Sequence, residues 1–337
     1  MTSPRLLVGG ALLLIVVAIL AIGFGSVAIA PGDVIGILAR QLFGAGEAAQ
    51  GAGATSIVME LRLPRILAAI LVGAALAVAG GAFQSLLRNP LADPYVLGTS
   101  SGAALGAAIA ILLPIGGVAW ELGGVQLAAF IGALASVALV WRVAGIGSGE
   151  ERIASVLLVG YAVASLLAAA LSLVMLASGA NLRAIFSFLL GGLDGATWPR
   201  LAAAALPLIV ATTLLALRGR ALAGFLLGDE AAQHLGVDVR RERRIAVALA
   251  SLATAAAVAL AGLIGFVGLV VPHLVRLAVG PDPRAVLPLS AIGGALLLLL
   301  ADTIARSIGV PVGVITALIG APFLLWLLHR ARTGYAL

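Results

Sequence analysis

The 337-residue sequence contains no cysteine and no lysine, and only 10% of its residues are charged. Without cysteine the chain has no disulfide framework, no cysteine-ligated metal and no thiol nucleophile. Without lysine it has neither a Schiff-base amine nor a P-loop of the G-x-x-x-x-G-K-[ST] kind, which excludes a standard ATPase site. The three histidines, His234, His273 and His329, are scattered, so we expect no metal site. The sequence therefore predicts no catalytic residue and no cofactor within this chain.

Apolar residues dominate what is present. Hydrophobic residues make up 62% of the chain and the mean hydropathy is +1.21, whereas a soluble domain has roughly 25% charged residues. A helix needs about 20 apolar residues to cross a bilayer core of about 30 Å. Charges, prolines and glycine clusters divide the sequence into ten apolar segments, at about 6–30, 57–88, 95–113, 121–142, 152–176, 200–218, 241–264, 266–280, 285–307 and 311–329. We predict an all-α polytopic membrane protein with ten transmembrane helices in one domain, residues 1–337.

Three stretches need separate interpretation. The apolar run 6–30 is longer than the 7–15-residue core of a signal peptide, so we interpret it as the first span. The segment 266–280 is short and begins with Gly265-Phe-Val-Gly268, so its helix need not cross fully. The stretch Asn181–Trp198 is too polar at its ends for a span, and its centre, RAIFSFLL, predicts a short interfacial helix.

The arginines predict the orientation of the chain. With the N-terminus inside, 14 of the 20 arginines fall on the cytoplasmic side, as the positive-inside rule requires. The other six, on the outer side, are Arg40, Arg62, Arg65, Arg183, Arg200 and Arg306. We therefore predict that both termini are cytoplasmic, and we interpret the net charge of +6 as topology, with no nucleic-acid partner.

Small residues spaced four apart predict close helix packing. Lipid gives transmembrane helices no hydrophobic reason to associate, and small residues let their backbones approach. Three such rows are Gly73–Ala77–Gly81, Gly102–Gly106–Ala110 and Gly313–Ala317–Ala321. They predict a tight helical bundle.

The one long polar island, Arg218–Arg244, holds 10 of the 34 charged residues. Asp229 and Glu230 predict the start of a short helix, because acids complement the positive helix terminus, and Gly236 predicts its C-terminal cap. Asp238 can cap the next helix. We expect the arginines that follow to anchor that helix at the headgroups; they are Arg240, Arg241, Arg243 and Arg244. The island is either an element through which a cytoplasmic partner moves the spans or an ordinary positive-inside loop.

On the outer side, Arg62 and Arg65 run against the positive-inside trend, and Arg306 lies at another outer helix end. Together they suggest an acidic docking partner, since a single surface ion pair contributes only about 0–1 kcal/mol. Snorkelling anchors are the alternative.

The acid nearest to a mid-span position is Asp302, which lies four residues before Arg306 on the same helix face. A structural ion pair between them and a functional intramembrane acid are both open interpretations. Without a buried carboxylate relay or a P-loop, the protein is a channel or takes its energy from another chain.

Four stretches resemble the permeases of the iron-chelate and cobalamin ABC importers: residues 61–106, 228–237, 265–277 and 298–328. The resemblance spans nearly the whole chain in the same order. It implies a type II ABC importer permease: a homodimer of ten-helix subunits in the bacterial inner membrane, with a translocation path on the two-fold axis. It also implies two ATPase subunits on the cytoplasmic face, which bind ATP and Mg, and a periplasmic or surface-tethered binding protein outside.

The resemblance also assigns roles to residues. The family's coupling helix, which meets the ATPase, corresponds to Gly228, Asp229, Glu230, Ala231, Ala232, Gln233, His234, Leu235, Gly236 and Val237. Its outer arginines, which meet acids of the binding protein, correspond to Arg62, Arg65 and Arg306, and its N-P-L-A gate motif to Asn89 and Leu91. A second, hydroxylated gate pair has no counterpart here.

The expected function is that of a permease, not an enzyme, since a separate subunit hydrolyses ATP. Within the family we expect an iron chelate, haem or a ferric siderophore, as the substrate, because iron chelates are the larger part of the family. Cobalamin is the alternative within the family. A self-sufficient secondary transporter or channel is the alternative from another class.

Overall fold

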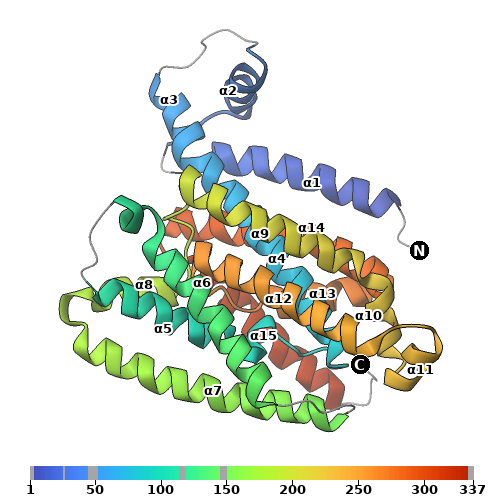
Figure 1. Ribbon diagram of the computed structural model, residues 1–337. Coiled ribbons are helices and arrows are strands. Elements are labelled where there is room, and N and C mark those ends of the chain that lie inside the picture. Colours follow the sequence, from blue (N-terminus) through green and yellow to red (C-terminus); the bar gives the residue numbers. More distant parts are fainter. Residues whose placement is uncertain (1–3, 26, 45–51, 114–117, 145–149, 333–337) are drawn as a thin grey trace.

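The computed structural model describes residues 4–25, 27–44, 52–113, 118–144 and 150–332, and within these ranges it contains helices and no strand. Ten helices correspond to the ten predicted segments: α1 (Pro4–Gly23), α4 (Leu63–Leu86), α5 (Thr99–Leu112), α6 (Val118–Val143), α7 (Glu150–Ala177), α9 (Trp198–Leu217), α12 (Val239–Ala261), α13 (Val267–Val279), α14 (Pro283–Ile308) and α15 (Val312–Arg332) (Figure 1). Among the described residues, eight helices are long and apolar enough to cross a membrane, and α5 and α13 are shorter. The predicted all-α multi-pass fold is confirmed.

Helix α4 lies at the centre of the bundle. It packs against α14, α12, α13 and α9. In its most apolar stretch 78% of the residues are buried, compared with 17% in α1 and in α7, which lie at the periphery (Figure 1). The sequence of α4 permits this position because it is built largely of alanine, glycine, valine and leucine, which leave its backbone accessible to neighbours on every side.

The central helix makes its closest contacts through glycine. Gly73 of α4 and Gly294 of α14 meet backbone to backbone, and a β-carbon on either would clash with the other's carbonyl oxygen. Gly102 of α5 meets Gly132 of α6 in the same way. The first two predicted rows of small residues therefore mark real helix contacts. In the third row, Gly313 packs against the Leu190 carbonyl, but Ala321 is exposed.

The sharpest of these approaches gives a test of the packing. A β-carbon on Gly80 would overlap the carbonyl group of Gly268 in α13, so Gly80→Ala should force the two helices apart. Overpacking of this kind costs about 1–3 kcal/mol, and we expect a lower unfolding temperature of the detergent-solubilised protein. Gly9→Ala is the matched control, because nothing lies near a β-carbon at Gly9 and alanine is the better helix former. Equal unfolding temperatures for the two variants would contradict the packing.

The two short helices begin inside the protein. At 1.5 Å per residue, α5 and α13 are about 20 Å long, less than the bilayer core. Helix α13 follows a non-helical linker, 262–266, in which Gly262 and Phe266 have positive φ values of 67° and 69°. The backbone at and before this linker is bound by α8 (Leu182–Leu189) and the loop after it: Leu263 N donates to Phe188 O at 3.3 Å, and Gly192 N donates to Ala261 O at 2.8 Å. Non-helical backbone is tolerated at this depth because protein surrounds it.

Some elements differ from the predicted segments. The first span ends at Gly23 and not near residue 30, because a turn follows and Pro31 starts a new helix, α2 (Pro31–Phe43). Helix α4 is preceded by α3 (Ala52–Ser56) and a π-helix, η1 (Ile57–Arg62), and α5 by a 3-10 turn, η2 (Pro94–Leu97). The short helix predicted within 181–198 is α8, which follows η3 (Gly179–Asn181). The polar island contains a helix that the sequence did not predict, α10 (Gly219–Leu226), before α11 (Asp229–His234).

The bundle has two polar ends. We call them the α11 end, where α1 begins and α15 ends, and the α8 end, where α1 ends and the loop from α8 to α9 lies (Figure 1). The candidate functional residues divide between these two ends.

Candidate functional site

Helix α11 at the α11 end begins with two acids and ends at a glycine cap, as the sequence predicts. Its backbone enters through Gly228, at φ 100°, and Asp229 and Glu230 form its first turn. At its other end Gly236 adopts φ 82°, and its N–H donates to Gln233 O at 2.9 Å while Val237 N donates to Ala232 O at 3.0 Å. These two bonds form a Schellman motif, which requires a residue such as glycine at the left-handed position. The predicted Asp238 cap of α12 is also present, with Arg241 N donating to Oδ1 at 3.0 Å.

Helix α11 is fixed to the membrane helix α12 by a partly buried ion pair. Arg243 Nη2 donates to both carboxylate oxygens of Asp229, at 2.8 and 2.9 Å, and the guanidinium lies 5.4 Å from the centre of the Phe225 ring. Arg243 is 9% exposed. The prediction that Arg243 is a headgroup anchor was wrong, because its side chain turns inward to the acid that opens α11. Of the four arginines, Arg240, Arg241 and Arg244 are exposed.

The inner face of α11 packs on α10. Ala232 is fully buried, and both Ala232 and Val237 lie beside Gly224 of α10. A second ion pair, Arg218 Nη1 to Glu242 Oε1 at 2.7 Å, joins the end of α9 to α12. The remaining face is open; its exposed residues are Glu230, Gln233, His234 and Leu235, the last of them 67% exposed. A short element held by α10 and α12 thus presents a mixed polar and apolar surface.

The predicted gate residues lie in the turn after α4. Asn89 is exposed, and its side-chain oxygen accepts a hydrogen bond from Leu91 N at 2.9 Å, so the asparagine shapes the turn. Further along, Asp93 caps η2 by accepting from Tyr95 N at 2.8 Å, and burial raises the pKa of Asp93 to about 6. Gln84 donates to Ala92 O at 3.4 Å, which fixes the turn to α4. The gate role of Asn89 and Leu91 stays a prediction.

At the α8 end, Arg62 closes the end of the first span. Its guanidinium donates to three carbonyl oxygens, two in the last turn of α1 and one just after it: Ile22 at 2.6 Å, Gly23 at 3.2 Å and Val27 at 2.5 Å. A helix leaves its final carbonyl groups without partners, and a cation near them is favourable. Arg62 is only 6% exposed, so it offers a docking partner little surface in this conformation.

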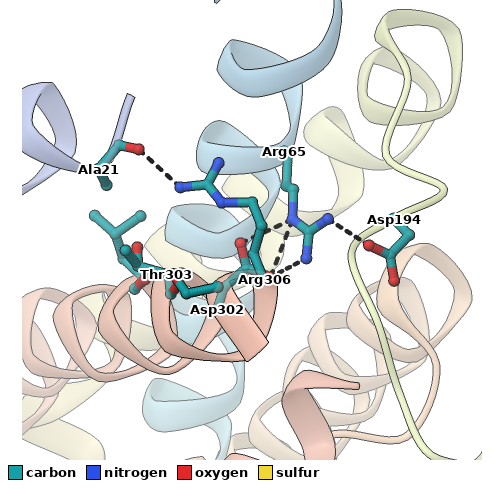
Figure 2. Close-up of polar contacts among 8 residues, drawn as sticks. Ala21, Arg65, Asp194, Asp302, Thr303 and Arg306 are labelled. Carbon is teal, nitrogen blue, oxygen red and sulfur yellow. Dashed lines mark hydrogen bonds and ion pairs between the residues drawn. The ribbon is translucent and has the colours of Figure 1, made fainter. Parts of the chain in front are cut away.

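Arg65 binds two acids that are far apart in the sequence (Figure 2). Asp302 of α14 accepts from Arg65 Nε, at 2.9 and 3.1 Å to its two oxygens, and from Nη2 at 2.8 Å. Asp194, in the loop between α8 and α9, accepts from Nη1. The possible Asp302–Arg306 ion pair is thus replaced by Asp302–Arg65. Helical spacing puts residues 302 and 306 on one face of α14. The neighbouring helix α4 brings Arg65 to Asp302, and Arg65 takes the place of Arg306 as its partner.

Arg306 points toward α1 instead, where its Nη2 donates to Ala21 O at 2.7 Å (Figure 2). Its Nε and Nη1 atoms are buried and have no hydrogen-bond partner among the described residues. The three predicted docking arginines therefore lie close together at one end of the bundle, and we call Arg62, Arg65, Arg306, Asp194 and Asp302 the outer cluster. Docking through it stays a prediction.

Beside the outer cluster, a cavity of about 780 Å³ opens at the α8 end. The ends of α5, α6, α8 and α12 line it together with the loop that carries Asp194, and Ser187, Asp194 and Arg200 supply polar groups. Sequence reasoning did not find this cavity, because most of its lining residues are alanine, glycine or larger apolar residues like those of the rest of the chain.

These features define a multi-pass helical permease with one polar surface at each end. Residues 13–330 match the FecCD transport family. The chain is 47% identical to the cobalamin import system permease protein BtuC of Halobacterium salinarum, over 89% of this chain and 79% of that protein. It is 39% identical to the hemin transport system permease protein HmuU of Yersinia pestis, over 98% and 97%.

Among solved structures, a metal-chelate type ABC transporter in an inward-facing conformation superimposes with a TM-score of 0.83 at 29% identity, covering 97% of this chain and all of that one. The chain belongs to the FecCD transport family, and it is a permease component of an ABC transporter.

Proposed function

We propose that this protein is the membrane permease of an ABC importer and forms the translocation pathway for a metal chelate across the inner membrane. In this proposal two copies assemble around the pathway, the α11 end and both termini face the cytoplasm, and the α8 end faces outward. ATP and Mg are bound by a separate ATPase subunit. Membership of the FecCD transport family favours this function over a self-sufficient transporter or channel.

The observation that carries the proposal is the attachment of α11. A helix of six residues is not stable alone, yet this one ends in a Schellman motif and is joined to α12 by the partly buried Asp229–Arg243 pair. Its exposed face can then receive a partner while its buried side moves with α12. Displacement of α11 by an ATPase subunit would therefore reach α12, which contacts the central helix α4.

The substrate proposal follows the relatives. A cobalamin import permease and a hemin transport permease both match, and the structural neighbour is of the metal-chelate type. We propose an iron chelate, haem or a ferric siderophore, since the hemin permease aligns over nearly the full length of both chains. Cobalamin is the second candidate, favoured by the higher identity of 47% to the cobalamin permease.

Reconstitution tests the proposal. The permease, co-expressed with the ATPase encoded beside it, should purify as a complex, and proteoliposomes containing it should take up one of three labelled chelates, hemin, a ferric siderophore or cobalamin, only with ATP and the binding protein. An ATPase variant without its P-loop lysine is the control and should abolish uptake. If no complex forms and uptake does not depend on ATP, the protein is instead a self-sufficient channel or secondary transporter. The labelled chelate that is taken up identifies the substrate.

A further inference from the structure

Asp194 is an acid for which the proposed function has no role. It is 77% exposed at the α8 end, and yet it holds an arginine whose side chain is only 12% exposed. We propose that Asp194 is a built-in competitor of the binding protein: its carboxylate occupies Arg65 until a carboxylate of the docking partner displaces it. This inference rests on the proposed docking of a binding protein at the α8 end.

The geometry of Arg65 separates a permanent partner from an exchangeable one (Figure 2). A guanidinium presents its N–H groups along two edges that can each bind a carboxylate. Asp302, which is 1% exposed, occupies the edge formed by Nε and Nη2. The buried acid thereby fixes the direction of the guanidinium and leaves Nη1 pointing toward the loop. Asp194 binds that remaining group.

The two acids differ in how easily they can leave. Separating Asp302 from Arg65 would leave the buried carboxylate of Asp302 without water or a counterion. Asp194 loses little when its bond breaks, because water and salt reach its carboxylate. An incoming acid can therefore replace Asp194 while Asp302 keeps Arg65 in place.

The charge of the outer cluster favours an incoming acid. Its three arginines and the buried Asp302 sum to +2, and Asp194 lowers this to +1. Two buried nitrogen atoms of Arg306, Nε and Nη1, also have no hydrogen-bond partner among the described residues. A carboxylate brought by a partner protein would meet a positive site, whereas a cationic partner would be repelled.

Asp194 also lies at the mouth of the cavity. The tip Asp194–Gly195 is exposed, while Leu193 before it and Ala196 after it are buried, with Ala196 N donating to Leu193 O at 3.0 Å. The loop is thus anchored on both sides, and its tip is held by side chains: Asp194 binds Arg65, and Gly195 O accepts from Arg200 Nη1 at 3.2 Å. Because Asp194 and Gly195 line the cavity of about 780 Å³, releasing the tip when the partner docks changes the entrance that the substrate would use.

Binding measurements test the proposal. The cognate binding protein would be titrated against the permease–ATPase complex in nanodiscs, using the unmodified protein, Asp194→Asn and Glu60→Gln. Glu60 is an exposed acid two residues before Arg62 and forms no ion pair among the described residues, so Glu60→Gln makes the same charge change at this end without releasing a cluster arginine. An exposed ion pair of at most about 1 kcal/mol corresponds to about fivefold in affinity. We expect Asp194→Asn to bind about three- to fivefold more tightly at low salt.

Salt and a mobility probe complete the test. The advantage of Asp194→Asn should vanish near 1 M salt, where the Debye length falls to about 3 Å. Since the chain has no cysteine, Gly195→Cys gives a single site for a spin label, and docking of the binding protein should increase the mobility of the label.

Equal affinities of Asp194→Asn and Glu60→Gln, or weaker binding by Asp194→Asn, would overturn the competitor role while docking stands. No binding by the unmodified complex, with no ATP-driven uptake, would overturn the proposed function itself.

Discussion

Replacing Asp302 with asparagine should lower the free energy of unfolding by about 3–5 kcal/mol, which is typical of breaking a buried ion pair by removing one partner. Asp302 accepts three hydrogen bonds from Arg65 and is almost completely buried. Without its charge, Arg65 and Arg306 would face each other at the α8 end with only the exposed Asp194 as a counterion. The measurement is thermal unfolding of the detergent-solubilised protein, together with the fraction recovered as a monodisperse species.

Asp194→Asn is the matched control for Asp302→Asn, since both acids bind the same guanidinium. We expect it to change the free energy of unfolding by no more than about 1 kcal/mol, because its carboxylate is in water. The double variant Arg65→Met/Asp302→Leu removes both buried charges and should recover much of the stability, while abolishing docking through Arg65. If Asp302→Asn unfolds at the same temperature as Asp194→Asn, the buried pair does not stabilise this end of the bundle.

Replacing Arg243 with alanine should reduce ATP-driven uptake at least tenfold while the spans stay folded. The substitution removes the bidentate bond to Asp229 and the contact with the Phe225 ring, so α11 is no longer fixed to α12. The ATPase could still bind and hydrolyse ATP, but its movement would not reach the membrane helices. Uptake per ATP hydrolysed, measured in proteoliposomes, therefore falls more than the ATPase rate does.

Two variants give this prediction its controls. Arg240→Ala removes an exposed arginine one turn earlier in α12 and should leave uptake per ATP unchanged. Arg243→Lys keeps the charge but loses the planar guanidinium that lies over the Phe225 ring, so an intermediate value is expected. Unchanged coupling in Arg243→Ala would mean that α11 transmits motion through α10 alone, by way of Ala232 and Val237.

Patterns local in the chain were predicted well from the sequence. The short helix at Asp229 with its glycine cap, the Asp238 cap of α12, and the ten apolar segments each depend on residues within a few positions of one another. Hydrogen bonds of caps and the 3.6-residue period of helices are local, so their signals survive in a single sequence. The end of the first span was misplaced because residues 24–30 are also mostly apolar and contain no charge.

The partners of the arginines could not be predicted. Arg62 and Arg65 are three residues apart, but one binds the backbone at the end of α1 and the other binds Asp302 and Asp194. These partners lie between 35 and 237 positions away along the chain, and which of them is within reach depends on how α1 and α14 pack around α4. Arg243 was likewise assigned to the headgroups, because its contact with Asp229 depends on how α11 folds back on α12.

By itself the sequence determined that this chain is a multi-pass membrane protein that contains no lysine, with a capped polar segment between two spans. Composition and local spacing are sufficient for these conclusions, because the bilayer forces each apolar segment to satisfy its own backbone as a helix. Only the tertiary structure decided which charges are buried and paired, and that an exposed acid, Asp194, occupies Arg65. The net stabilisation of a charged side chain depends on its solvent exposure and on the distance to its counterion, and both are fixed only when distant helices pack together.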